Sequence, residues 1–172
     1  YADNIWYHGS MARSAWIDAG INTYPISAAY NNVLVNHEIG TDDNTTGSPT
    51  AMNSYITSAE FDIEDGTSFG FIRRVLPDVT FRGSTSVSPT MALSITPLKN
   101  SGSGYYSPAS VGGSSSASVV RTATTPIEQF TGQVFIRARG RQMVFTVGAN
   151  QLGTAWQWGS MRIDYDLDGT KG

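Results

Sequence analysis

Polar and apolar residues alternate with a period of two along most of the chain, which is the pattern of half-buried β-strands. Residues 55–63 form the first clear example, with an apolar face made by Tyr55, Ala59, Phe61 and Ile63. An Asp65-Gly66 turn leads from this segment into a second alternating segment at 68–75. Because Asp-Gly between two alternating segments favours a tight turn, the sequence predicts a β-hairpin here.

The alternation continues toward the C-terminus. After Pro77-Asp78 it restarts at Val79 and Phe81, and Met91, Leu93 and Ile95 follow with the same period across a loop at 83–88. The last fifty residues predict three more strands, whose inward residues are Val134, Ile136, Ala138, Met143, Phe145, Val147, Met161, Ile163, Tyr165 and Leu167. Three strands in series with polar outer faces indicate an antiparallel meander or the edge of a β-sandwich.

These patterns predict an all-β chain. Two helical turns over 10–19 are the only helical alternative, and Gly20 together with poor apolar spacing disfavours them. We expect an antiparallel β-sandwich over residues 32–172, preceded over residues 1–31 by the end of a β-rich, propeller-like part. The Gly/Ser-rich segment at 100–118 is expected to be a flexible loop, or a loop that a neighbouring subunit orders.

Amino-acid composition argues against several classes of function. The net charge is −3, only 15% of residues are charged, and nine of the eleven basic residues are arginine. A protein that binds polyanions is usually basic, so sequence-specific nucleic-acid binding is not predicted, and arginine suits fixed, paired contacts. The chain has no cysteine, which excludes disulfides and thiolate ligands, and no run of eighteen apolar residues, so membrane insertion is not expected.

Motifs for catalysis or metal binding are incomplete. His37-Glu38 lacks the second histidine that a zinc-protease motif needs, because position 41 is threonine; His37 is instead expected to be a hydrogen-bonded structural residue. No Gly-x-Ser-x-Gly motif is present, and acidic pairs such as Glu60 and Asp62 carry no specific signal. We therefore predict no enzyme activity, no catalytic residues and no cofactor.

The segment from Asp164 to Gly169 resembles the first half of a calcium loop, in which alternate carboxylates hold one cation. Its acids also alternate with apolar residues, as on the solvent face of a strand. The strand interpretation is favoured, and no metal site is predicted.

Arginines and aspartates form the strongest candidate for an interface. A two-residue period places Arg137 and Arg139 on one sheet face, where Asp164 and Asp166 can lie opposite on a neighbouring strand. The predicted structural or interface residues are Arg137, Arg139, Arg141, Arg162, Asp164, Asp166, Trp156 and Trp158.

The phrase Trp-x-x-Gly-Ser-Met occurs twice, at 6–11 and at 156–161. The flanking sequences do not align, so an internal repeat is not indicated. We expect each copy to end a strand, with an indole covering the sheet edge and glycine allowing a turn before methionine re-enters a core.

The run VFIRARGRQMVFTVGANQLGTAWQWGSMRIDYDLDG, Val134 to Gly169, resembles the closing segment of large tail proteins of tailed bacteriophages. The upstream segments HGSMARSAWIDAG, NVLVNHEIGTDD and SYITSAEFDIEDGTSFGFIRRVLPDV resemble the same proteins in the same order. The resemblance implies a virion structural protein of the tail nozzle or tail-hub kind found in short-tailed phages, and this chain would be the C-terminal portion of a larger one.

Such proteins assemble as a ring, commonly a hexamer, beside other tail proteins, and viral DNA passes through without sequence-specific binding. The resemblance names no catalytic residue. The alternative that stays open is a carbohydrate-binding β-sandwich, which would stack sugars on Trp6, Tyr105, Tyr106 or Trp156.

Overall fold

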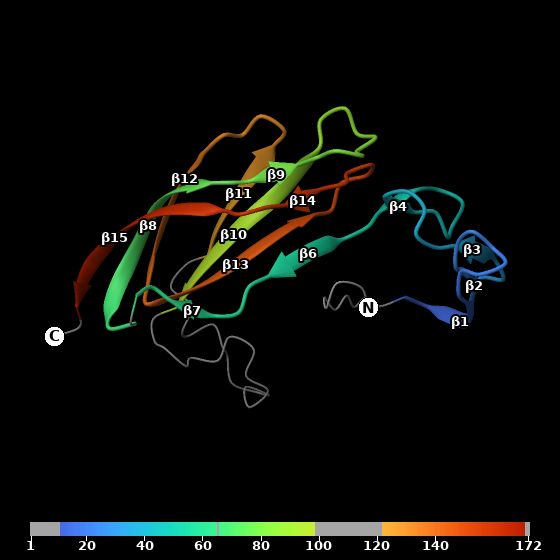
Figure 1. The fold of residues 1–172 in the computed structure, drawn as a ribbon, viewed down its shortest axis with the longest axis horizontal. Helices are drawn as coiled ribbons and strands as arrows, with labels where there is room; N and C mark the ends of the chain where they lie inside the picture. The colour runs from blue at the N-terminus through green and yellow to red at the C-terminus, as the bar shows by residue number, and fades with distance from the viewer. Residues whose placement is uncertain (1–10, 65, 99–121, 171–172) are drawn as a thin grey trace. The chain divides into compact units, whose positions relative to one another are not determined.

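Every regular element in the described part of the chain is a β-strand, which confirms the all-β prediction (Figure 1). The computed structural model describes residues 11–64, 66–98 and 122–170. No helix long and apolar enough to cross a membrane occurs among them. The chain divides into two compact units, residues 1–50 and 51–172. Two predicted features lie outside the described residues: Trp6 of the first Trp-x-x-Gly-Ser-Met copy, and the Gly/Ser-rich segment at 100–118.

The N-terminal unit contains a small antiparallel sheet of β1 (Arg13–Ile17), β2 (Ile26–Ala29) and β3 (Leu34–Asn36), in that order. A tight turn joins β2 to β3, in which Asn32 adopts a φ of 64°. A propeller-like part was predicted for residues 1–31, and this hairpin crosses the end of that region. The propeller-like assignment stays a prediction. Strands β4 (Asp42–Asp43) and β5 (Thr50–Ala51) form a separate pair.

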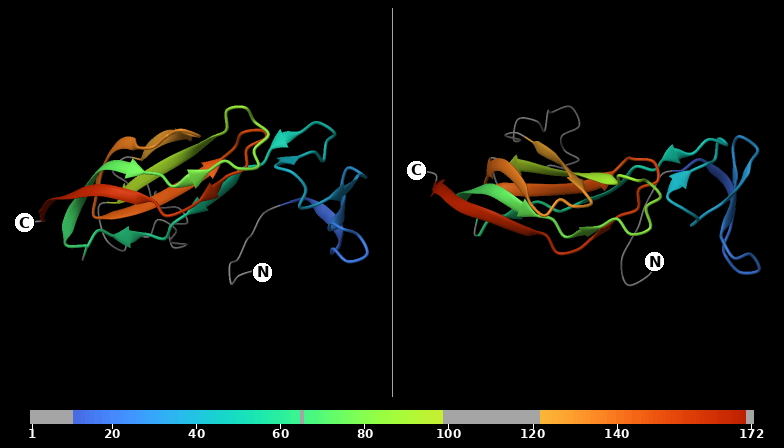
Figure 2. Two further views of the ribbon diagram at one scale, coloured as in Figure 1. Left: turned by 45° about the horizontal axis from the view of Figure 1, so that its top comes forward. Right: turned by 90° about the horizontal axis from the view of Figure 1, so that it is seen from above.

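The C-terminal unit is built from two facing antiparallel sheets, as expected of a β-sandwich (Figure 2). One sheet, here called the β10 sheet, has the order β11 (Ala123–Glu128), β10 (Thr90–Leu98), β13 (Gln142–Ala149) and β6 (Ser54–Thr57), and β7 (Phe61–Asp62) also pairs with β13. The other, the β8 sheet, has the order β12 (Val134–Gly140), β8 (Ser68–Leu76) and β15 (Arg162–Thr170). A short pair is formed by β9 (Val79–Thr80) and β14 (Gln157–Trp158).

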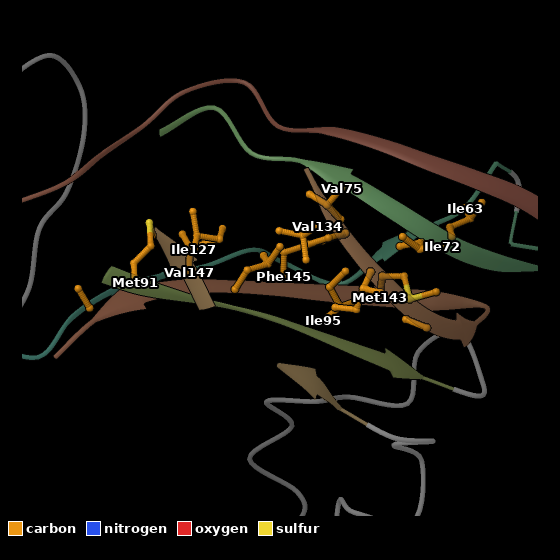
Figure 3. Close-up of a cluster of buried hydrophobic side chains, with 14 of the residues drawn as sticks. Ile63, Ile72, Val75, Met91, Ile95, Ile127, Val134, Met143, Phe145 and Val147 are labelled. Atoms are coloured by element: carbon orange, nitrogen blue, oxygen red, sulfur yellow. The ribbon is translucent and has the colours of Figure 1, made fainter. Parts of the chain in front are cut away.

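The hydrophobic core lies between these two sheets. Ile72 and Val75 of β8 face Ile95 of β10 and Met143 of β13 across the sandwich (Figure 3). The predicted inward residues of the strands at 91–95, 134–138 and 143–147 are all buried, as the alternation indicated. Burial of these branched and aromatic side chains removes apolar surface from water, which is the main favourable term in folding.

The predicted hairpin across Asp65-Gly66 is wrong. β6 and β7 pair with β13 in the β10 sheet, whereas β8 pairs with β12 and β15 in the other sheet. The Gly66 amide does bond to the Ile63 carbonyl at 3.2 Å, with a φ of 73° at Gly66, so the turn exists. The chain crosses between layers at this turn, and Ile63 packs beside Gly70, where a Cβ would lie 2.1 Å from the Ile63 Cδ1 atom.

Two further predictions need correction. Residues 55–63 are not one strand but β6 and β7, separated by residues 58–60. Tyr55 is exposed because Ile56, its neighbour, lies opposite the buried Val147, so that Tyr55 points to the outer face. The meander near the C-terminus is also wrong, since β12, β13 and β15 alternate between the two sheets. Gly140 marks the crossing from β12 to β13, where a Cβ would meet the Leu98 carbonyl oxygen at 2.9 Å.

Candidate interaction face

The outer face of the β8 sheet carries an array of arginines and aspartates, which begins at a bulge in β8. Asp164 of β15 pairs with Arg74, and the next residue, Tyr165, pairs with Ile72. Arg73 is therefore the extra residue of a β-bulge, and such a residue re-aims its side chain. As a result both Arg73 and Arg74 reach acids of β15.

Three ion pairs tie the strands of this sheet together. Arg73 lies 2.8 Å from Asp166, Arg74 lies 3.2 Å from Asp164, and Arg139 pairs with Asp168. The Arg139 Nη2 atom also donates to the Asp168 carbonyl oxygen at 3.0 Å. All six side chains are about half exposed, so each pair contributes only about 0.2–1 kcal/mol to stability. Their main physical effect is to hold the charged groups in fixed positions on the face.

Phe69 anchors the end of this array. The guanidinium carbon of Arg139 lies 4.4 Å from the centre of the Phe69 ring, and that of Arg141 lies 5.5 Å away. Arg141 also donates to the Thr67 carbonyl oxygen at 2.9 Å. Cation–π contacts of this kind add about 0.5–1 kcal/mol at exposed sites. Arg141 therefore fixes the turn into β8 rather than extending the row of Arg137 and Arg139.

A hollow of about 850 Å³ opens on the same face. It is lined by Phe71, Arg73, Arg74, Phe135, Ile136, Arg137 and Asp164. Phe135, one of these lining residues, is 75% exposed. Arg137 makes no ion pair with any residue of the described part of the chain. The hollow thus combines an exposed aromatic ring with an arginine that has no ion pair within residues 11–64, 66–98 and 122–170.

The second Trp-x-x-Gly-Ser-Met segment lies elsewhere in the sandwich. The Trp156 indole N–H donates to the Ser54 hydroxyl at 2.8 Å, and Trp158 pairs with Val79 through β14 and β9. The Gly159 amide donates to the Asp78 carbonyl oxygen at 2.7 Å, an approach so close that a Cβ would lie 2.2 Å from the Asp78 carboxylate. Met161 then packs against the core. For this copy, the predicted return of methionine to the core is confirmed, whereas glycine permits a close approach to Asp78 and not the predicted turn.

Trp158 also lines an apolar groove of about 290 Å³ between the open edges of the two sheets. The other lining residues are Ile56, Ser58, Phe61, Phe145, Val147, Met161 and Ile163. Phe61 and Phe145 stack there with ring centroids 5.2 Å apart. The two predicted tryptophans are therefore not part of the array on the β8 sheet.

The sequence anticipated the charged face but assigned some of its contacts to the wrong strands. Asp164 and Asp166 do pair with arginines, yet their partners come from β8, which lies between β12 and β15, and not from Arg137 or Arg139. Arg162 is exposed at the start of β15. Arg73, Arg74, Phe69 and Asp168 were missed as members of this face. The available signal was the Arg73-Arg74 doublet, which interrupts the alternation of the strand at the position of the bulge.

The N-terminal unit holds a separate polar cluster around His37. The Ser27 hydroxyl lies 2.6 Å from His37 Nε2, and the Arg13 Nε atom donates to the same nitrogen at 3.4 Å. The Trp16 and His37 rings lie 4.4 Å apart. Burial, and secondarily the Arg13 charge, lowers the pKa of His37 below its usual value of 6.5. Ser27 is only 2% exposed, so this pair is a structural hydrogen bond, as predicted for His37.

Asp164, Asp166 and Asp168 lie along β15, which confirms the strand interpretation of the segment that resembles a calcium loop. Within the described residues, no cluster of three His, Cys, Asp or Glu side chains is placed to hold a metal ion. Trp6, Tyr105 and Tyr106, the other aromatic residues considered for sugar binding, lie outside the described residues. Comparison with protein-family models and with curated proteins finds no match to the chain.

Proposed function

We propose that the chain is a structural component of a phage virion, in which it forms part of a ring at the tail nozzle or hub. In this proposal it binds copies of itself and neighbouring tail proteins, and the ring surrounds the passage for viral DNA. The fold supports a scaffold role because the arginines and aspartates of the β8 sheet are fixed by mutual contacts. The ordered resemblance to tail proteins supplies the viral context.

One observation carries the assembly part of the proposal: the outer face of the β8 sheet presents pre-positioned charges beside the exposed ring of Phe135. Arginine and aromatic residues are enriched in protein interfaces, where rigid groups lose little entropy on binding. An exposed aromatic ring that lines a hollow is the arrangement that a partner's side chains can cover. Passage of DNA requires no base contact, and a chain with a net charge of −3 would bind the polyanion weakly.

The test is the oligomeric state of the full-length gene product. Sedimentation velocity and light scattering over a hundredfold concentration range are expected to show a closed oligomer of one size, and electron microscopy of the same sample is expected to show rings. Labelled antibody against the chain should then mark the tail of intact particles. Monomers at every concentration, or labelling away from the tail, would contradict the proposal.

A carbohydrate-binding module is the second candidate, because Trp158 lies in an apolar groove where a sugar ring could stack. The candidate predicts that the monomer binds glycans from a panel and that its tryptophan fluorescence changes on binding. Trp158→Ala should abolish that change, whereas Trp16→Ala should not. The ring proposal predicts no fluorescence response to any glycan.

A further inference from the structure

Of the three arginines that line the hollow on the β8 sheet, Arg137 has no ion-pair partner among the described residues. Arg73 and Arg74 are neutralised by Asp166 and Asp164, but no described residue neutralises Arg137. Phe135, two positions earlier on the same strand and therefore on the same face, exposes most of its ring. The complementary ligand is therefore a carboxylate that is held close to apolar surface.

The N-terminal unit offers carboxylates close to exposed apolar side chains. Its residues 11–50 contain four acids and one arginine, whereas residues 51–172 contain nine acids and ten basic residues. The one arginine, Arg13, makes hydrogen bonds to His37 and Thr45. The unit also exposes many large apolar side chains, among them Trp16, Ile17, Tyr30 and Leu34.

Strand β1 and the residue after it combine an acidic charge with exposed apolar side chains. β1 is an edge strand of its sheet, so its outer side has no neighbouring strand among the described residues. At its C-terminal end Trp16 and Ile17 are exposed, and Asp18 follows them. Asp18 accepts a hydrogen bond from the Trp16 indole at 2.6 Å, which fixes the carboxylate beside the aromatic ring. A carboxylate held beside an exposed indole thus follows directly after an edge strand.

We infer that the segment Trp16-Ile17-Asp18 of one copy docks into the hollow of a second copy, with Asp18 on Arg137 and the Trp16 indole on Phe135. This inference rests on the proposed ring, and it names the surfaces that form the ring contact. The two surfaces differ, so the contact is head-to-tail, and contacts of this type close into rings when the rotation between neighbours permits.

The test uses charge reversal in the full-length protein. Asp18→Arg and Arg137→Glu should each place like charges in the contact, and each should raise the concentration for half-assembly at least about tenfold. The double variant restores an opposite pair and should assemble almost as the wild type does. An equimolar mixture of the two single variants should also assemble, because each contact in an alternating ring then joins opposite charges.

Three controls separate this contact from general effects. Arg82→Glu and Glu38→Arg change exposed charges outside the proposed contact and should leave assembly unchanged. Asp18→Asn removes the charge but keeps an acceptor for the Trp16 indole, so it should weaken assembly while leaving the thermal unfolding temperature unchanged.

The possible results separate the inference from the proposed function. Rings that form normally from both single variants would overturn this contact and leave the ring proposal intact. Assembly that is lost in the single variants but not restored by the double variant or the mixture would also overturn the pairing of Asp18 with Arg137. A wild-type protein that stays monomeric would overturn both.

Discussion

Arg139 of β12 reaches Asp168 of β15 across β8, the strand that lies between them in the sheet. The guanidinium crosses above Phe69, whose ring it contacts at 4.4 Å. The contact therefore links the two edges of the β8 sheet, which share no backbone hydrogen bonds with each other. An ion pair that joins edge strands resists splaying of the sheet as well as loss of register.

We expect Arg139→Gln to lower the free energy of unfolding by about 1 kcal/mol, because it removes a half-exposed ion pair and a cation–π contact. Arg139→Lys should recover only part of this loss, since lysine lacks the planar fork that bonds to both the carboxylate and the carbonyl of Asp168. Urea denaturation measures both values. The matched control is Arg162→Gln on the same sheet, where a change of more than about 0.5 kcal/mol would show that any lost arginine has this effect.

The close contact between β13 and β6 depends on Gly148. A Cβ at this position would lie 2.7 Å from the Ser54 carbonyl oxygen and 2.8 Å from the Tyr55 Cβ atom. Gly148→Ala should therefore displace β6 and cost about 1–3 kcal/mol of stability, as overpacking does. Because Trp156 donates to the Ser54 hydroxyl, its fluorescence should change as well. Gly132→Ala is the control, since nothing lies within 4 Å of the added methyl, and equal destabilisation by both changes would refute the steric explanation.

Truncation at the centre of the core should be the most damaging single change considered. Ile72 is 0% exposed and packs between the sheets, so Ile72→Ala should cost about 2–5 kcal/mol, and Ile72→Val about 0.5–1.5 kcal/mol. Val87→Ala, at a position that is 97% exposed, should change stability by less than about 0.5 kcal/mol. Thermal unfolding followed by circular dichroism compares the three variants. A loss below 1 kcal/mol for Ile72→Ala would mean that the two sheets do not pack as described.

The sequence predicted which residues are buried better than which strands pair, although Tyr165 and Leu167, which were expected to be inward, are 39% and 50% exposed. Val134, Ile136 and Ala138 are inward, as their period indicates, because alternation directly reports the two faces of a strand. Alternation cannot say which of two sheets a strand joins. Asp65-Gly66 gives the same local signal for a hairpin as for a crossing between layers. The crossing is accompanied by the packing of Ile63 on Gly70, a contact that no local pattern encodes.

The same limit applies to the candidate interaction face. Arginines and aspartates were expected to pair across strands, and Asp164 and Asp166 do so. Their partners could not be identified, because β8 was assigned to a hairpin with the preceding segment and not to the position between β12 and β15. Once a bulge is recognised at Arg73 and Arg74, both side chains become available to β15. Long-range strand order, rather than residue chemistry, was the missing information.

The last prediction concerns the stability of the N-terminal unit below neutral pH. Burial and the nearby Arg13 charge lower the pKa of His37 in the folded state below 6.5, although Asp43 and Glu38 act in the opposite direction. The unfolded chain therefore binds the proton more readily, and protonation favours unfolding. Stability should decrease as the pH falls from about 6.5, and the decrease should continue until His37 is protonated in the folded state as well.

Fluorescence of Trp16, which lies against the His37 ring, reports unfolding of this unit in urea titrations at several pH values. His37→Gln should flatten the dependence between pH 7 and pH 5. His8→Gln removes the other histidine of the chain and so separates the two titrations. Asp43 acts in a different window, because hydrogen bonds from Thr45 lower its pKa below 3.8 and its contribution is lost only at still lower pH. An unchanged slope in His37→Gln would show that His37 does not set the acid sensitivity.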